Sequence, residues 1–323
     1  MRVLLIKLSS LGDVVHTLPA AMDIAACLPQ ARIDWVVEPA FAAVVRLCPA
    51  IDTVIEMDLR RWRRRPWATE TRSAWKAFLA QLRAHEYDSV IDLQGLTKSA
   101  WVSRLAHVAV GGQRVAMAHR TEGSSYEAPT RWAANRLISV PTHIHAVDRA
   151  RAVCAQALAY ALPSFQPGLA RMLRTEGLKA RQVLCVHGTS RDDKLWPESH
   201  WIEIGRRLQS EAWVPVFPHG SAVEEARALR LQDALPGSQV WPRWPLDRLS
   251  AEMAGLGGVI GVDSGLSHIA VALGLPHVQL YNFDTAWRTG PQHAAHQIGL
   301  VAAPCPSVES VWQAWQQVLG APP

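Results

Sequence analysis

The chain has 323 residues, nearly half of them hydrophobic, and a formal net charge of +5. This length is typical of two domains with a core each, and the composition excludes an intrinsically disordered chain. Five positive charges lie in one run, RRWRRR at 60–65, so the rest of the chain is balanced. Because a protein that wraps duplex nucleic acid usually spreads its cations over one face, the charge pattern argues against that class.

Short apolar runs alternate with amphipathic stretches in the first half of the chain. The predicted strands there are 3–8, 33–38, 53–57 and 89–94. A helix is expected from about residue 17, and 72–85 carries apolar residues at the i, i+3, i+4, i+7 spacing of a second helix. Strands separated by helices predict a parallel, doubly wound sheet.

The same pattern restarts in the second half. The predicted strands are 182–188, 213–217, 239–241, 258–263 and 277–281, and the predicted helices are 198–210, 222–234 and 266–273. The predicted fold class is therefore α/β, with two Rossmann-like domains facing a cleft at the carboxyl ends of their strands, where ligands bind. The expected boundaries are an N-terminal domain 1–165, a linker 166–181, a C-terminal domain 182–305, and a last helix 306–323 that could pack back on the N-terminal domain.

Cysteine usage and hydropathy set the expected compartment. Five scattered cysteines without a CxxC pair argue against a disulfide framework or a zinc site and favour a reducing cytoplasm. The start, MRVLLIKLSS, has too short an apolar run for a signal peptide, and no apolar stretch approaches the roughly 20 residues of a spanning helix. We expect any contact with a membrane to be made from the side.

The first candidate site is KLSSLGD, residues 7–13, where a strand gives way to a helix. Backbone N–H groups and the helix dipole favour an anion at such a junction, so Asp13 is expected to be ionised at neutral pH. Facing the cleft, this carboxylate could accept a proton from an attacking hydroxyl. The alternative is that Asp13 only caps the helix. The segment lacks the lysine and glycine spacing of a P-loop.

The second candidate site is TSRDDKLWP, residues 189–197, again between a strand and a helix. Two hydroxyls and one ammonium, from Thr189, Ser190 and Lys194, could hold a phosphate there. The chain has no D-x-D spacing for a metal-bound diphosphate, which favours neutralisation by Lys and Arg without a metal. The alternative is a solvated polar loop.

The third candidate site is GVDSGLSH, residues 261–268. Ser264, Gly265 and Leu266 would offer backbone N–H groups to a diphosphate, because their position opens a helix. His268 would lie one turn further on, and Asp263 would cap the helix or fix the loop. The alternative is an ordinary turn between a strand and a helix.

Two further candidates are single charged side chains. A carboxylate after the strand that ends in PHG, either Glu224 or Glu225, could accept hydrogen bonds from a ribose diol, or could only complement the first turn of a helix. Arg120 lies in a loop, where a lone arginine is usually a surface charge.

In order and spacing, these motifs resemble the bacterial lipopolysaccharide heptosyltransferases, which are GT-B enzymes of glycosyltransferase family 9. RRWR is typical of the type I members. The resemblance extends from residue 1 to about 275. The matching segments are KLSSLGD (7–13), RRWRRR (60–65), DLQGLTKSA (92–100), the Arg120 region, TSRDDKLWP (189–197) and VDSGLSHIAVALG (262–274).

The resemblance implies inverting, metal-independent transfer of L-glycero-D-manno-heptose from ADP-heptose, with no cofactor, to the Kdo of Kdo2-lipid A. The enzyme would lie at the cytoplasmic face of the inner membrane, in peripheral contact with anionic lipid, and would take no nucleic acid. Asp13 would be the general base, and Lys194 would neutralise the leaving diphosphate. The resemblance also implies donor contacts from Thr189, Ser190, Glu224, Asp263, Ser264, Gly265, Leu266 and His268, and acceptor contacts from Arg60, Arg61, Arg63, Arg64 and Arg120.

Other functions stay open on the sequence alone. One is a related GT-B enzyme, such as a type II heptosyltransferase, a transferase with another nucleotide-sugar donor, or an epimerase. Another is a nucleic-acid-binding protein that uses RRWRRR with Trp62 and Trp67 as stacking groups.

Overall fold

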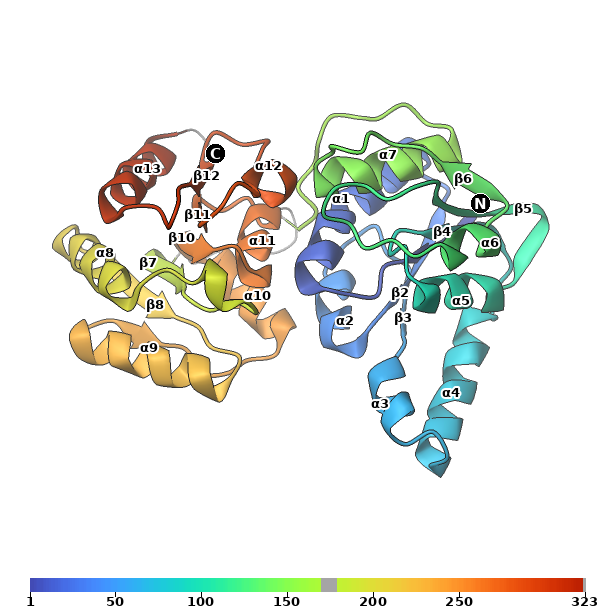
Figure 1. The fold of residues 1–323 in the computed structure, drawn as a ribbon, viewed down its shortest axis with the longest axis horizontal. Helices are drawn as coiled ribbons and strands as arrows, with labels where there is room; N and C mark the ends of the chain where they lie inside the picture. The colour runs from blue at the N-terminus through green and yellow to red at the C-terminus, as the bar shows by residue number, and fades with distance from the viewer. Residues whose placement is uncertain (170–178, 322–323) are drawn as a thin grey trace. The chain divides into compact units, whose positions relative to one another are not determined.

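The computed structural model describes residues 1–169 and 179–321. The chain divides into two compact units, Met1–Gln166 and Pro167–Pro323, and each unit is built on one six-stranded sheet (Figure 1). Residues 170–178 of the linker expected at 166–181, and the last two residues of the helix expected at 306–323, lie outside the described residues.

The first unit contains a sheet of order β3-β2-β1-β4-β5-β6, in which all pairs are parallel. Its strands are β1 Arg2–Ile6, β2 Arg32–Val37, β3 Thr53–Glu56, β4 Tyr87–Asp92, β5 Val108–Met117 and β6 Arg136–Ile138. Its helices are α1 Leu11–Cys27, α2 Pro39–Arg46, α3 Leu59–Arg64, α4 Thr69–Leu82, α5 Thr97–Leu105, α6 Pro129–Ala133 and α7 Ala146–Leu158.

Helices cover both faces of this sheet, because successive residues of a strand point to opposite sides and residues 3–6 of the central strand β1 are all apolar and buried. Leu4 and Ile6 of β1 face a core that also holds Trp62, Phe78 and Leu82 of α3 and α4. Figure 1 shows α3 and α4 lying together and projecting from the lower end of this unit.

The second unit repeats the arrangement with the order β12-β11-β10-β7-β8-β9, again parallel throughout. Its strands are β7 Lys179–Val186, β8 Val214–Phe217, β9 Gln239–Val240, β10 Leu256–Val262, β11 His277–Tyr281 and β12 Gln297–Val301. Its helices are η1 Asp192–Lys194, α8 Glu198–Ser210, α9 Ala222–Ala234, α10 Leu246–Ala254, α11 Gly265–Ala272, α12 Ala286–Thr289 and α13 Val308–Gly320.

The last helix is part of the second core. Val311 and Trp315 of α13 are fully buried with Trp201 and Leu208 of α8, and α13 also contacts β11 and β12. The helix therefore packs on the second unit, whereas the sequence had left packing on the N-terminal domain open.

Each sheet has the strand order 3-2-1-4-5-6 when its strands are counted from the start of its unit. This is the doubly wound Rossmann order, and it confirms the predicted fold class. In such a sheet the loops after the first and fourth strands diverge at the point where the order reverses, and ligands bind there. These loops follow β1 and β4 in the first unit, and β7 and β10 in the second.

Candidate active site

Asp13 lies at the point where the strand order of the first sheet reverses. α1 begins at Leu11, earlier than the residue 17 expected from sequence, because Ser10 already serves as its N-cap. The Ser10 N–H and hydroxyl donate to Oδ2 of Asp13 at 3.2 and 3.0 Å, while the Lys7 ammonium lies 3.6 Å from Oδ1. The Asp13 side chain is still 41% exposed, so it caps the helix and remains accessible.

Opposing effects set the pKa of Asp13. Desolvation raises this pKa, whereas the Lys7 ammonium and the hydrogen bonds from Ser10 lower it, and the net pKa is below the ordinary value. Asp13 is therefore a carboxylate at neutral pH. It can accept a proton from a hydroxyl placed against its exposed side.

The loop that carries Asp13 is fixed by the loop after β4. Oε1 of Gln94 accepts hydrogen bonds from the N–H groups of Leu8 and Ser9 at 2.9 and 3.0 Å. Gln94 is held in turn by Asp92, whose Oδ1 accepts from the Gln94 N–H at 2.9 Å. Burial raises the pKa of Asp92 to about 6 in spite of these bonds.

An ion-pair network joins this loop to the arginine run. The buried carboxylate of Glu38 receives the Lys98 ammonium at 2.9 Å and the Arg60 guanidinium at 3.1 Å. Lys98 also donates to the hydroxyl of Ser9 at 3.2 Å. Sequence reasoning assigned no role to Glu38 or Lys98, although Lys98 lies in the DLQGLTKSA segment.

The run RRWRRR forms most of α3, which the sequence did not predict as a helix. Trp62 is turned inward, 8% exposed, with its ring 5.5 Å from that of Trp75. Its partners leave no face free for a nucleic-acid base, which removes one stacking group that the nucleic-acid alternative requires. Three more of the arginines proposed for the acceptor lie on α3 and are exposed: Arg61, Arg63 and Arg64. In the described part of the chain, no carboxylate forms an ion pair with these three.

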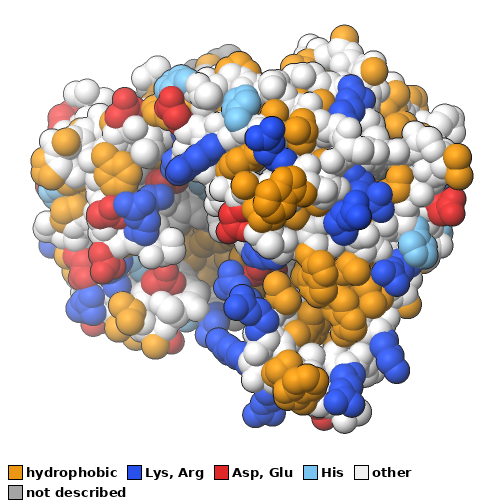
Figure 2. Space-filling model, turned by 45° about the vertical axis from the view of Figure 1, so that its right-hand side comes forward, with side chains coloured by type: hydrophobic (Ala, Val, Ile, Leu, Met, Phe, Trp, Pro, Cys, Tyr) orange, Lys and Arg blue, Asp and Glu red, His pale blue; other side chains and the backbone are white. Residues whose placement is uncertain are grey.

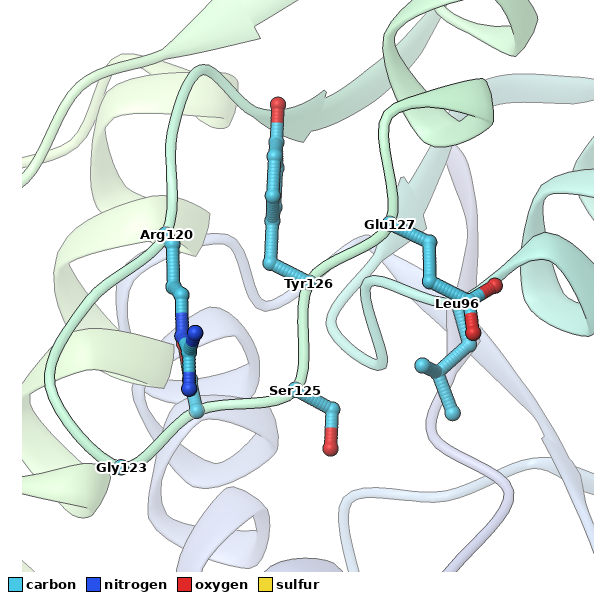
Figure 3. A pocket seen from close by; sticks show the side chains of 7 residues that line it. Leu96, Arg120, Gly123, Ser125, Tyr126 and Glu127 are labelled. Carbon is cyan, nitrogen blue, oxygen red and sulfur yellow. The ribbon is translucent and has the colours of Figure 1, made fainter.

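Arg120 lines a pocket of about 430 Å³ between the loop 119–127 and the start of α5. In Figure 3, the side chains of Arg120 and Ser125 extend from the same side of this loop, and Tyr126 points away from them. The loop approaches β4 closely because Gly95, with φ of +75°, has no Cβ that would meet the carbonyl of Ser125. Arg120 therefore lies in a concave site, as an anion-binding residue would.

The second site centres on Asp263, at the end of β10. The Lys194 ammonium is 2.6 Å from its Oδ2, and Nε2 of His268 is 3.3 Å from its Oδ1. Desolvation acts against ionisation, but the bonds and charges of His268 and Lys194 hold the pKa of Asp263 well below its usual range. Asp263 thus orients the side chains of Lys194 and His268. Because a carboxylate and a phosphate are both anions, Asp263 would act on a bound phosphate through Lys194 and not by direct contact.

The remaining residues predicted at the donor site gather around Asp263. The Thr189 hydroxyl donates to the backbone oxygen of Asp263 at 3.1 Å. Oγ of Ser264 is buried and makes no hydrogen bond in the structure, so it is available to a ligand. Gly265 and Leu266 open α11, where N–H groups are unpaired. Ser190 is exposed nearby.

Of the two glutamates left open, Glu224 faces the ends of β7 and β8. Its Oε2 accepts the N–H of Gly220 at 2.7 Å, and a Cβ added to Gly188 would lie 2.4 Å from its Oε1. Glu225 is exposed. The geometry thus favours Glu224 as a ligand-facing carboxylate.

Asn282, after β11, is a residue of this site that sequence reasoning missed. Its Nδ2 donates to the backbone oxygens of Asp193 and Leu195, both at 2.9 Å, on either side of Lys194. The amide therefore fixes the short turn that carries the lysine. Nothing local in the sequence connects positions so far apart; only the sheet order brings them together.

Two features are absent from the described residues. Across 1–169 and 179–321, no group of three or more His, Cys, Asp or Glu residues could hold a metal ion. Within the same ranges, no helix has both the length and the apolar character to cross a bilayer.

Two Rossmann-like units in one chain have the architecture of the GT-B class of proteins. Comparison with known proteins identifies the family. A family model described as "Glycosyltransferase family 9 (heptosyltransferase)" matches residues 75–312, and the chain belongs to this family.

Individual relatives agree with this assignment. The chain is 40% identical over 293 residues to lipopolysaccharide heptosyltransferase 1 of Pseudomonas aeruginosa PAO1, covering 90% of this chain and 81% of that protein. Escherichia coli heptosyltransferase WaaC with ADP superimposes with a TM-score of 0.88 at 33% identity, covering 98% and 100% of the two chains. WaaC with ADP-2-deoxy-2-fluoro heptose gives 0.83 at 34%, covering 97% and 98%.

Proposed function

We propose that this glycosyltransferase transfers L-glycero-D-manno-heptose from ADP-heptose to the Kdo of Kdo2-lipid A in the synthesis of the lipopolysaccharide inner core. The observation that carries the proposal is the pair of matched sites: Asp13 at the reversal point of one sheet, and Asp263 with Lys194 at the same point of the other. The related WaaC structures, with ADP and with a fluorinated ADP-heptose, support the choice of donor.

In this proposal the second unit binds the donor. The N–H groups of Ser264, Gly265 and Leu266 and the free hydroxyl of Ser264 receive the diphosphate at the start of α11. Thr189 and Ser190 lie beside it, and His268 is held toward the site by Asp263. Glu224 accepts hydrogen bonds from the ribose diol.

The chemistry needs one base and a stabilised leaving group. Asp13 removes the proton from the acceptor hydroxyl while its oxygen forms a bond to the anomeric carbon of the heptose. The bond from that carbon to the diphosphate oxygen breaks on the opposite face, which inverts the configuration and releases ADP. Lys194 moves from Asp263 toward the diphosphate as its charge grows, and so supplies the cation without a metal.

The acceptor carries phosphates and sugar carboxylates, which match the cations of the first unit. Arg61, Arg63 and Arg64 are exposed on α3, Arg60 is held by Glu38, and Arg120 faces its own pocket. Because the acceptor is a lipid, the enzyme works in peripheral contact with the cytoplasmic face of the inner membrane.

The test is incubation of the purified protein with ADP-heptose and deacylated Kdo2-lipid A, followed by mass spectrometry of the product. We expect a product one heptose heavier and release of one ADP. A product that forms only with another nucleotide sugar, or only with an acceptor that already carries heptose, would overturn the assignment.

A further inference from the structure

A shallow apolar groove lies on the first unit, and none of its lining residues has been given a role above. It has a volume of about 310 Å³ and lies between α5 and α6. Two of its side chains are exposed tryptophans, Trp132 at 80% and Trp101 at 45%. We call it the tryptophan groove; its lining residues are Thr97, Ala100, Trp101, Arg104, Pro129, Trp132 and Ala133.

The groove is supported from beneath by packed aromatic rings. Trp101 stacks on Trp75 with ring centroids 5.0 Å apart and planes 6° from parallel. Trp75 packs in turn against Trp62 of the arginine helix α3 and against Phe78. The exposed indole of Trp101 is therefore held rigid, and an apolar surface that is ordered while facing water marks a contact site. Figure 2 shows hydrophobic side chains gathered on this face of the first unit, with Lys and Arg side chains around them.

The charges around the groove are almost all positive. Arg83 donates to the carbonyl of Leu105 at 2.9 Å, and Arg114 donates to those of Ser103 and Ala106 at 2.9 and 3.0 Å, so both guanidiniums lie at the end of α5. Within the described residues no carboxylate forms an ion pair with the cations of this rim: Arg83, Arg104 and Arg114. The nearby Glu127 is already bonded to the N–H and hydroxyl of Thr97.

We propose that the tryptophan groove and its arginine rim form the surface by which this protein docks on an anionic lipid bilayer. Indole rings favour the boundary between headgroups and acyl chains, because one edge is polar and the rest apolar. Arginines without carboxylate partners keep their full charge for lipid phosphates, each worth about 1 kcal/mol near such a surface. The inference rests on the proposed function for its biological setting, but the binding itself is tested without any catalysis.

The first experiment is co-sedimentation with vesicles of phosphatidylglycerol and phosphatidylcholine, against vesicles of phosphatidylcholine alone. The wild type is expected to bind the anionic vesicles, and added salt to weaken the binding. Trp132→Ser should weaken it about tenfold, the effect of withdrawing one large apolar side chain. Arg104→Ser, which removes an exposed arginine that lines the groove, should weaken it about fivefold.

The matched controls lie on the second unit and should not change vesicle binding. Val223→Ser removes an apolar side chain that is 72% exposed, and Arg206→Ser removes an exposed arginine. Equal losses in the control and groove variants, or no binding of the wild type to anionic vesicles, would overturn the proposal. Unchanged melting temperatures of the groove variants verify that they fold.

The second experiment separates docking from catalysis. Trp132→Ser is expected to retain wild-type turnover on a water-soluble, deacylated acceptor and to lose at least about fivefold on the acylated acceptor embedded in vesicles. Equal loss on both acceptors would place Trp132 in the catalytic machinery and refute docking. If the wild type binds vesicles but transfers no heptose to either acceptor, the proposed function fails and the docking surface stands.

Discussion

Asp13 combines two tasks that sequence reasoning had set against each other. Its Oδ2 accepts two hydrogen bonds from Ser10 at the start of α1, and the carboxylate still keeps a partly exposed side next to Lys7. The cap fixes the orientation of the carboxylate, so the bonds that stabilise the helix also orient the base that we propose. Capping and the proposed catalytic role are therefore compatible at this position.

This dual role predicts different outcomes for two substitutions. Asp13→Asn keeps an oxygen that can accept from Ser10 but cannot take a proton, whereas Asp13→Ala removes both functions. We expect both variants to lose about 10²- to 10⁴-fold in turnover and to bind ADP-heptose normally. Both variants lose the ion pair with the buried Lys7, and Asp13→Ala should lose about 1 kcal/mol of stability more than Asp13→Asn, because only alanine also removes the acceptor for Ser10. Turnover of the Asn variant near that of the wild type would contradict the assignment of the base.

The two hydrogen bonds of Asn282 predict that its substitution weakens binding of the nucleotide. Asn282→Ala removes the two bonds that hold the turn around Lys194. We expect ADP binding to weaken by about fivefold to thirtyfold, since one to two bonds of about 1 kcal/mol each are lost from the turn, and the affinity for the acceptor to change little. Calorimetric titration with ADP measures this, and Gln316→Ala, which removes surface bonds to Glu211, is the control. Unchanged ADP affinity would show that the turn holds its shape without the amide.

At the level of elements, α3 places its arginines outward because Trp62 is anchored inward by Trp75 and Phe78. The like charges are tolerated because they face solvent and, in our proposal, the acceptor. The buried Glu38 ties this helix, through Arg60, to the loop before Asp13.

Charge reversal on α3 should separate the two substrates. With Arg61→Glu and Arg64→Glu combined, we expect the KM for the acceptor to rise at least about tenfold, because charge-assisted contacts to phosphates or carboxylates are lost. The KM for ADP-heptose should stay within about twofold of the wild type. Arg206→Glu on α8 serves as the control. If both KM values rise together, the arginines belong to the donor site.

The elements that could be read from the sequence have a clear apolar pattern, either a continuous buried run in a strand or helical spacing in an amphipathic helix. The strand predicted at 277–281 coincides with β11, and the helices predicted at 198–210 and 222–234 coincide with α8 and α9. β5 was missed because two glycines and two polar residues interrupt it, and β6 and β12 were missed because they are edge strands with exposed residues.

The candidate site was partly readable for a similar reason. Local motifs carry Asp13, Lys194 and the start of α11, since each lies within a short segment that joins a strand to the next helix or opens that helix. Glu38 and Asn282 act across large sequence separations, and no local pattern reveals that.

At the scale of the whole chain, the two units differ in how their buried groups respond to acid. Two histidines of the second sheet, His187 and His277, are fully buried, and burial lowers the pKa of each to about 4. In the unfolded chain a histidine titrates near pH ~6.5. Between these values the unfolded state binds more protons, so the free energy of unfolding falls as the pH falls. The lowered pKa of Asp263 acts in the same direction at still lower pH.

We therefore expect the second unit to lose stability between about pH 6.5 and 4, by up to roughly 1.4 kcal/mol per pH unit for each histidine. Hydrogen exchange of β7 and β11 at pH 7 and pH 5 measures this loss. His187→Leu should reduce the slope of the free energy of unfolding against pH by the contribution of one proton. His85→Leu, at an exposed position of the first unit, should leave this slope unchanged. Stability of these strands that does not depend on pH would refute the burial argument.

Lys194 is paired with a carboxylate and most arginines of α3 are not, and this difference predicts how each responds to ionic strength. Lys194 is mostly sheltered from solvent and paired with Asp263, whereas Arg61, Arg63 and Arg64 of α3 are exposed and, within the described residues, have no carboxylate partner. Dissolved ions weaken exposed charges far more than sheltered ones. Under the proposed function, a rise in potassium chloride concentration should therefore weaken binding of the acceptor before it weakens binding of the nucleotide donor.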